Sequence, residues 1–295
     1  MEINVRDDAV AMQRLLELPV AERFEALAAM RGLTAGDEGG RAFLRRIHEE
    51  GDGFRVGEDD PRYPDALRRL VEAGAWAQVD CELRRAWAHQ LDQNPGIAHP
   101  PAVDVVLTLG NPDDALFMEH NLGYYGMGAV PGSIWLCVWP TDFNISRIGA
   151  CAVHELAHNL RTPNVAGFDL AEWIVQEGLA ERFAVEVCGP DSTGAWYAGV
   201  TGEDFDRTWE VVTGAFGTGR SFSDWTGYVL GDLTAARFGR PPAGVPHMGG
   251  YAVGRRIIER YLAATGQSAA QAIATPAATI LEAAGVRGAA GAPRG

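Results

Sequence analysis

The sequence predicts an α+β fold that is mostly helical and contains a small sheet. Apolar residues recur at helical spacing through most of the chain, for example over residues 66–91. Two short apolar runs, residues 103–110 and 133–139, instead predict strands. Hydrophobic residues make up 47% of the 295 residues, which is ample for a core.

The first hundred residues are predicted to be helical. Residues 10–29 and 41–49 alternate apolar and charged side chains at helical spacing. Residues 66–91 are expected to form one long helix or two short ones. The charged, glycine-containing stretch 49–61 is typical of a solvated turn or linker. We therefore expect residues 1–98 to form a helical N-terminal region.

Two strands are expected after this region. Residues 103–110 have the composition of a buried strand. A glycine-rich passage, residues 121–132, then leads into a second apolar strand over residues 133–139. Gly126-x-Gly128 is not a dinucleotide-binding loop, because it precedes a strand instead of following one and opens no helix.

The sequence His-Glu-Leu-Ala-His at 154–158 lies in a stretch, residues 146–160, with helical periodicity. Residues four apart lie on one face of a helix, so His154 and His158 can bind one cation. Glu155 is turned by about 100° from this pair. From there it can reach a water on the metal without being a ligand itself.

A second helix is expected over residues 169–187, opened by a capping box at Asp169 and Glu172. Glu177 and Glu181 lie four apart on one face of this largely apolar helix. Like charges at that spacing repel, which makes a purely structural role unfavourable. A metal removes the objection if Glu177 is a ligand and Glu181 accepts the second N–H of a ligand imidazole. One Zn²⁺ per chain is therefore predicted, with the ligands His154, His158 and Glu177.

These motifs resemble those of the gluzincin metallopeptidases, to which thermolysin belongs, and more closely those of the YjaZ-like family of predicted Zn-dependent proteases. Three segments carry this resemblance, which covers about residues 100–285. They are VHELAHNLR (153–161), EWIVQEGLAERFA (172–184) and GGYAVGRRIIERYL (249–262). The metzincin pattern needs Gly and His where Arg161 and Asn164 stand, so it is excluded.

The resemblance implies a zincin-like (thermolysin-like) catalytic domain over residues 99–285, followed by a flexible tail over residues 286–295. It implies a zinc peptidase in which Glu155 takes a proton from the metal-bound water and passes it to the leaving amine. In zincins the strand before the metal helix lies at the sheet edge, where an extended peptide binds. Residues 133–139 have that position, although apolar residues on both faces are equally typical of a central strand.

The resemblance also implies a Tyr or His, C-terminal to the glutamate ligand, that helps to stabilise the oxyanion. Tyr251 is the first candidate because it falls within the third segment, and His247 is the second. Both follow a proline-rich loop, and Tyr251 opens a helix predicted over residues 249–263. The alternative is a Tyr packed at a helix start and a His on the surface. The other C-terminal helices are predicted over residues 203–216, 225–238, 268–274 and 276–284.

Composition limits the partners and the compartment. The net charge is −14, the pI is near 4.9, and the chain contains no lysine. These values argue against a nucleic acid or an anionic membrane as partner. No apolar run is long enough to span a membrane, and the N-terminus lacks the pattern of a signal peptide. The four cysteines have no paired spacing, so a reducing cytoplasm is expected.

The expected activity is hydrolysis of a peptide or protein substrate, and two alternatives stay open. The first is a zinc hydrolase that acts on a non-peptide amide or ester. The second is a metal-binding regulatory module without turnover. Glu155 argues against the second alternative, because a purely structural zinc needs no base at that place and usually has four protein ligands.

Overall fold

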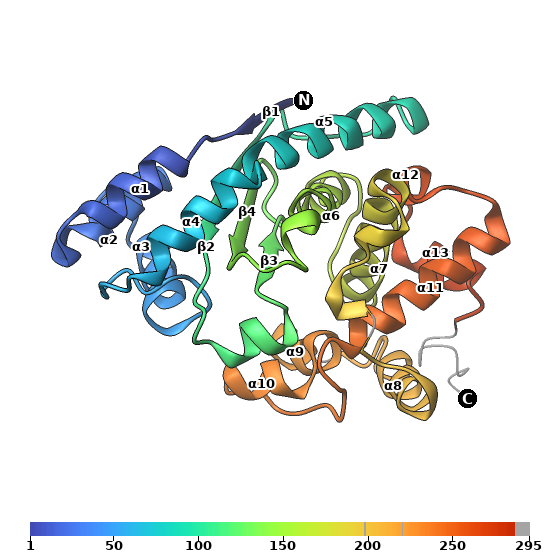
Figure 1. The fold of residues 1–295 in the computed structure, drawn as a ribbon. Coiled ribbons are helices and arrows are strands. Elements are labelled where there is room, and N and C mark those ends of the chain that lie inside the picture. The colour runs from blue at the N-terminus through green and yellow to red at the C-terminus, as the bar shows by residue number, and fades with distance from the viewer. Residues whose placement is uncertain (198, 220, 287–295) are drawn as a thin grey trace.

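The computed structural model describes residues 1–197, 199–219 and 221–286. The chain is mostly helical and has one four-stranded sheet of order β1-β2-β4-β3 (Figure 1), which confirms the α+β prediction. Strands β1, β2 and β4 run parallel to one another, and β3 is antiparallel to β4. The strands are β1 (Glu2–Val5), β2 (Ala102–Leu109), β3 (Tyr124–Met127) and β4 (Ser133–Val138).

Strands β2 and β4 confirm the two predicted strands, and of the two positions considered for the second one the structure shows the central position and not the sheet edge. Strand β4 pairs with β2 on one side and with β3 on the other, so it lies inside the sheet. All of its residues after Ser133 are buried, as is typical of a central strand with apolar residues on both faces. The edge strand beside β4 is β3, which the glycine-rich passage 121–132 contains, and β1 forms the opposite edge.

The N-terminal helices are divided more finely than the periodicity indicated. The stretch expected as helix over 10–29 is two helices, since Pro19 precedes the second one and has no N–H to continue the first. The stretch 66–91 is also two helices, separated at Gly74, whose φ is 67°. The bounds are α1 (Ala9–Glu17), α2 (Val20–Met30), α3 (Glu38–Arg45), α4 (Arg62–Glu72) and α5 (Ala75–Gln93).

The C-terminal half of the chain also contains a predicted helix that is divided in the structure. Asp169 caps the helix that begins at Leu170, as predicted, accepting a hydrogen bond from the Glu172 N–H at 2.8 Å. The predicted helix 225–238 is two helices, because Gly231 has a φ of 85° and its backbone touches Pro246. The bounds are α6 (Ile148–Arg161), α7 (Leu170–Cys188), α8 (Gly202–Gly214), α9 (Phe222–Leu230), α10 (Asp232–Arg237), α11 (Gly249–Thr265), α12 (Ala269–Ala272) and α13 (Ala277–Ala283).

Five short helical turns complete the described elements. They are η1 (Arg46–Glu50), η2 (Leu116–His120), η3 (Ile145–Arg147), η4 (Pro190–Ser192) and η5 (Ala195–Tyr197). None of the helices described combines the length and the hydropathy that a bilayer-spanning helix requires. The predicted flexible tail begins at residue 286, and its residues 287–295 lie outside the described part of the chain.

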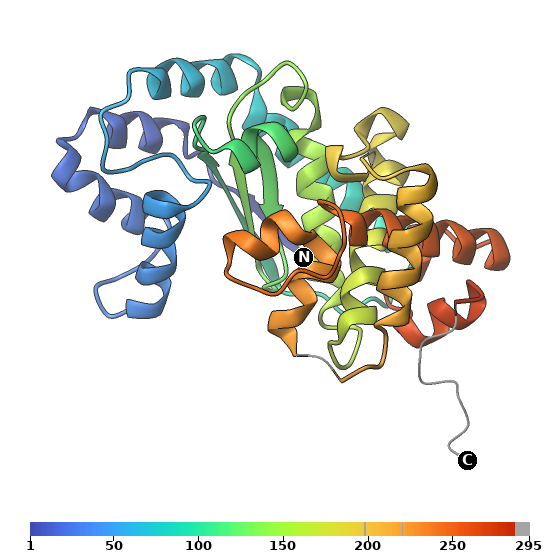
Figure 2. The ribbon, with the colours of Figure 1, turned by 90° about the horizontal axis from the view of Figure 1, so that it is seen from below.

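The N-terminal region shares its sheet and core with the rest of the chain. Helices α1–α3 lie on one side of the sheet and α7 and α11 on the other, as Figures 1 and 2 both show. Strand β1 comes from before residue 98 and nevertheless pairs with β2. One hydrophobic cluster extends from Ile3 to Ile273. The division of the chain at residue 98 stays a prediction.

Helix α6 lies at the centre of the molecule. It packs against β3 and β4, against α5 and against α7. All of its residues are buried, including His154, Glu155 and His158. A helix that is buried all round has no solvent-facing side for its polar residues, so each of them needs a partner inside the protein.

Helices α7 and α11 cross at two glycines. A Cβ on Gly178 would lie 2.3 Å from the carbonyl carbon and oxygen of Gly254, and a Cβ on Gly254 would lie 2.2 Å from the Ile174 carbonyl oxygen. The two backbones are therefore in direct contact. Helix α7 carries Glu177 and α11 carries Tyr251, so this contact sets the separation of those residues.

Replacing Gly254 by alanine should destabilise the protein by about 1–3 kcal/mol. The added methyl group would overlap the backbone of α7 at Ile174, and the two helices would have to move apart to accommodate it. Gly214→Ala is the matched control, since a Cβ there meets nothing within 4 Å. Urea unfolding at equilibrium measures both variants. Equal free energies of unfolding in the two variants would contradict the close crossing.

Candidate metal centre

The three predicted zinc ligands lie together in the interior. His154 Nε2 is 3.2 Å from His158 Nε2 and 3.2 Å from Glu177 Oε2. His158 Nε2 is 3.5 Å from the same Glu177 oxygen. The three residues are only 4–5% exposed. Among the described residues, this group could hold a metal ion.

These separations fit a tetrahedral zinc ion. Ligand atoms bound at roughly 2.0–2.1 Å in tetrahedral directions lie about 3.3 Å from one another. The three measured separations fall between 3.2 and 3.5 Å. Two imidazole nitrogens and one carboxylate oxygen are a donor set that zinc accepts, and they leave a fourth position for water or substrate.

The electrostatics of the group also favour a cation. Burial lowers the pKa of His154, but the nearby Glu177 and Glu181 outweigh it and raise that pKa to about 10. Burial opposes ionisation of Glu177, but His158 and His154 hold the pKa of its carboxyl below the ordinary 4.5. Positive charge is therefore strongly favoured between these side chains, and a metal ion would supply it in place of a proton.

Two aromatic residues that the sequence analysis did not identify hold Glu177. Trp173 donates its Nε1–H to Glu177 Oε1 at 3.1 Å, which leaves Oε2 facing the histidines. Tyr197 donates its hydroxyl to the Glu177 carbonyl oxygen at 2.8 Å. The four-residue spacing of Trp173 and Glu177 is a signal that could have indicated the first contact. Tyr197 lies in a turn-rich stretch without periodicity, so no comparable signal existed.

Glu181 lies on the far side of His154 from Glu177. Its Oε2 is 3.9 Å from His154 Nδ1, which is an ion-pair distance and too long for a hydrogen bond. Its Oε1 accepts a hydrogen bond from the Gly194 N–H at 2.9 Å. Glu181 is only 2% exposed. Its predicted role as the partner of a ligand histidine stays a prediction.

Glu155 lies between α6 and the edge strand β3. A Cβ on Gly126 would lie 2.4 Å from Glu155 Cγ, and a Cβ on Gly128 would lie 2.3 Å from the Glu155 carbonyl oxygen. The strand can approach this closely because both residues lack side chains. Burial raises the pKa of the Glu155 carboxyl, although His154 and His158 oppose the rise.

Asn159 fixes the turn between β3 and β4 beside Glu155. Its Nδ2 donates to the Gly128 carbonyl oxygen at 2.7 Å, and its Oδ1 accepts from the Gly132 N–H at 2.6 Å. Asn159 is fully buried. No local pattern in the sequence indicates this role, because the partners of Asn159 lie about thirty residues away along the chain.

The two candidates for the oxyanion donor differ in their surroundings. Burial, and then the charges of Glu177 and Glu155, raise the pKa of Tyr251 well above its ordinary value. Its ring lies against that of Tyr197, with 5.5 Å between the ring centres. His247 instead has its Nε2 3.2 Å from Asn121 Oδ1, and its ring lies 5.0 Å from that of His120. Burial and His120 lower the pKa of His247 to about 4.

The comparisons with known proteins agree with the predicted resemblance. A family described as "Predicted Zn-dependent protease (DUF2268)" matches residues 85–282. The "Uncharacterized protein YjfC" of Bacillus subtilis (strain 168) is 31% identical over 149 residues, which are 49% of this chain and 50% of that protein. The "Uncharacterized protein YjaZ" of the same strain is 29% identical over 147 residues, which are 48% and 53%.

The chain thus spans about half the length of the curated relatives it matches. No solved structure matches the chain.

Glu177→Ala should release most of the zinc, because two imidazoles alone hold the ion weakly. Trp173→Phe keeps all three ligands but frees the Glu177 carboxylate, so we expect zinc affinity to fall by about 10- to 100-fold. Glu210→Ala on the exposed side of α8 is the control. Zinc content after dialysis and titration with a chelator give the two results. A fully loaded Glu177→Ala variant would mean that the third ligand is misassigned.

Proposed function

The chain belongs to the family of predicted Zn-dependent proteases, and on that premise we propose that it is a gluzincin-type zinc metallopeptidase with a zincin-like catalytic domain. The observation that carries this proposal is the buried group of His154, His158 and Glu177 with Glu155 beside it. Structural zinc sites are usually closed by four protein ligands, often cysteines. This group instead has three ligands and an adjacent base, which supports hydrolysis over a regulatory module.

Glu155 is the proposed general base. Bound zinc would lower the pKa of its water toward about 7 and polarise the scissile carbonyl. Glu155 takes a proton from the attacking water and later gives it to the leaving amine. Burial raises the pKa of its carboxyl, which brings the basicity of the carboxylate closer to neutral pH. The same burial keeps bulk water away from the transferred proton.

The proposed position of the substrate is along β3. An edge strand has unpaired backbone groups on its outer side, to which an extended peptide can add as another strand. Strand β3 has this position, and Gly126 within it and Gly128 just after it lie against Glu155. A peptide bound there would lie beside the general base, which supports a peptide or protein as the substrate.

Tyr251 is the proposed donor to the oxyanion. Its raised pKa means that the hydroxyl keeps its proton at neutral pH and can donate it in a hydrogen bond. The charges of Glu177 and Glu155 contribute to that rise. The Tyr251 ring also contacts Tyr197, which donates to the Glu177 carbonyl oxygen. The contacts of His247 with Asn121 and His120 favour a structural role for that histidine.

Glu155→Gln should retain zinc and the fold but abolish hydrolysis, because the amide cannot take the proton. The measurement is cleavage of a diverse peptide library by the zinc-loaded protein, read by mass spectrometry, with zinc content measured in parallel. Full cleavage by this variant would remove the general-base role. Hydrolysis of an aryl ester by the parent, without any peptide cleavage, would favour the non-peptide alternative.

Tyr251→Phe should keep zinc and substrate binding while transition-state stabilisation falls by about 2.7–4 kcal/mol, which is about 10²- to 10³-fold in kcat. His247→Ala should leave kcat nearly unchanged. The two variants are compared by kcat and KM on one cleaved peptide. An unchanged kcat in Tyr251→Phe together with a large loss in His247→Ala would assign the donor to the histidine.

A further inference from the structure

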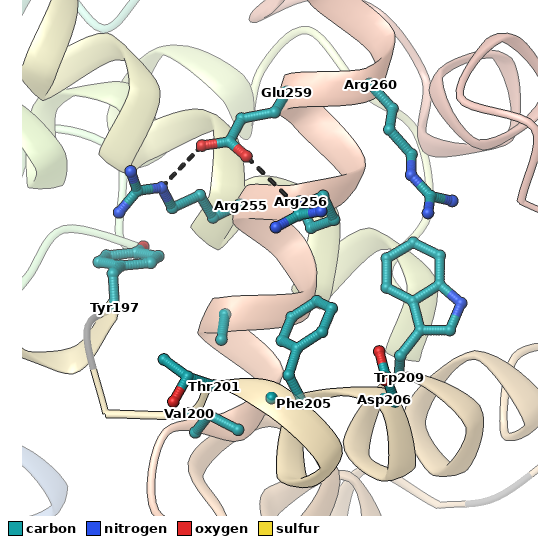
Figure 3. Close-up of a pocket in the computed structure, with 12 residues that line it drawn as sticks. Tyr197, Val200, Thr201, Phe205, Asp206, Trp209, Arg255, Arg256, Glu259 and Arg260 are labelled. Atoms are coloured by element: carbon teal, nitrogen blue, oxygen red, sulfur yellow. Dashed lines mark hydrogen bonds and ion pairs between the residues drawn. The ribbon is translucent and has the colours of Figure 1, made fainter.

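A groove with a volume of about 480 Å³ lies between α8 and α11 (Figure 3). Its size is within the range of small-molecule binding sites, about 300–1,000 Å³. Tyr197 and Val200 line one end, and Ala252 adds a further apolar contact. Figure 3 shows Arg256 and Arg260 of α11 facing Phe205 and Trp209 of α8, while Arg255 points toward Tyr197.

The groove has a surplus of positive charge. Arg255, Arg256 and Arg260 line it together with two acids, Glu259 and Asp206. Arg255 Nε is 2.9 Å from one Glu259 oxygen and Arg256 Nε is 3.5 Å from the other, so these two arginines share one carboxylate. Among the described residues, Arg260 has no acidic partner. Three arginines against two acids leave one positive charge in a chain of net charge −14.

Two of the arginines are positioned by aromatic rings. The guanidinium carbon of Arg256 lies 5.3 Å from the centre of the Phe205 ring, and that of Arg260 lies 4.5 Å from the Trp209 ring. The two arginines are four residues apart on α11, and the two aromatic residues are four apart on α8. The two contacts therefore lie one helical turn apart on both helices. An arginine held in this way can still offer its N–H groups to a planar carboxylate in bidentate fashion.

We propose that this groove binds a monocarboxylate with an apolar body. The carboxylate accepts hydrogen bonds from Arg256 and Arg260, and the apolar part packs against Phe205 and Trp209. A single negative charge neutralises the surplus in the groove, whereas a dianion would leave an excess of negative charge. The same chemistry is offered by a free organic acid and by the C-terminal carboxylate of a peptide with an apolar last residue.

The groove shares a wall with the metal-binding region but is independent of the proposed peptidase activity. Tyr197 lines the groove, donates to the Glu177 carbonyl oxygen and contacts the Tyr251 ring, with 5.5 Å between the ring centres. Binding in the groove is measured directly as heat. The protein could therefore bind a carboxylate in the groove without being a peptidase. It could equally be a peptidase whose groove binds no carboxylate.

The test is isothermal titration calorimetry of the zinc-loaded Glu155→Gln protein, which prevents turnover of a peptide probe. The probes are 3-phenylpropionate, the peptide Ala-Ala-Ala-Phe with a free carboxylate, and the amide of that peptide. At least one of the two acids should bind, and the amide should bind more weakly. Arg260→Gln should weaken binding of the acid by about tenfold or more, because a charged hydrogen-bond donor is lost.

Arg240→Gln is the matched control, since it removes the same charge at an exposed site outside the groove. Arg256→Gln is a second variant if Arg260→Gln lowers the melting temperature. Three results would overturn the inference: no heat with either acid at millimolar concentration, equal binding of acid and amide, or equal affinities in the groove and control variants. Binding of the peptide acid alone assigns the peptide terminus as ligand, and binding of 3-phenylpropionate assigns a free acid.

Discussion

The packing of α6 against α7 is the constraint on which the metal-binding group depends. Arg161 near the end of α6 forms a buried bidentate pair with Glu172 in the first turn of α7, with 2.9 Å between Nη2 and Oε2. Its remaining nitrogen donates to the carbonyl oxygens of Ile273 and Thr275. A buried ion pair is tolerated when its other hydrogen bonds are also made. This pair fixes the two helices where His158 faces Glu177.

The parts of the centre that could be predicted are those that local spacing determines. His154, His158 and Glu155 lie within one helical turn and a half, so the helix alone fixes their relative directions. Glu177 lies on the next helix, and its placement between apolar residues indicated a buried partner. Trp173 and Tyr197 could not be assigned in the same way, because an aromatic side chain is compatible with simple core packing. Their hydrogen bonds depend on which of their atoms faces Glu177.

The order of the strands in the sheet, and two of the strands themselves, could not be predicted from local sequence patterns. Strands β2 and β4 are apolar and were predicted from that property, but their order depends on pairings between segments far apart in the chain. Strand β1 alternates polar and apolar residues over only four positions, which is the shortest run that indicates a strand. Strand β3 lies in a glycine-rich passage and has no such alternation. The glycines that hide β3 from such an analysis are also what allows it to lie against Glu155.

Gly178 and Gly254 allow a similarly close approach between two helices, α7 and α11. Neither residue can donate a proton, bind a metal or contact a substrate through a side chain. A survey of functional residues by chemical type would therefore omit both, although they set how far Tyr251 lies from Glu177. During divergence, a single added methyl group at this crossing would alter the spacing of two chemically active residues while leaving each of them unchanged in the sequence.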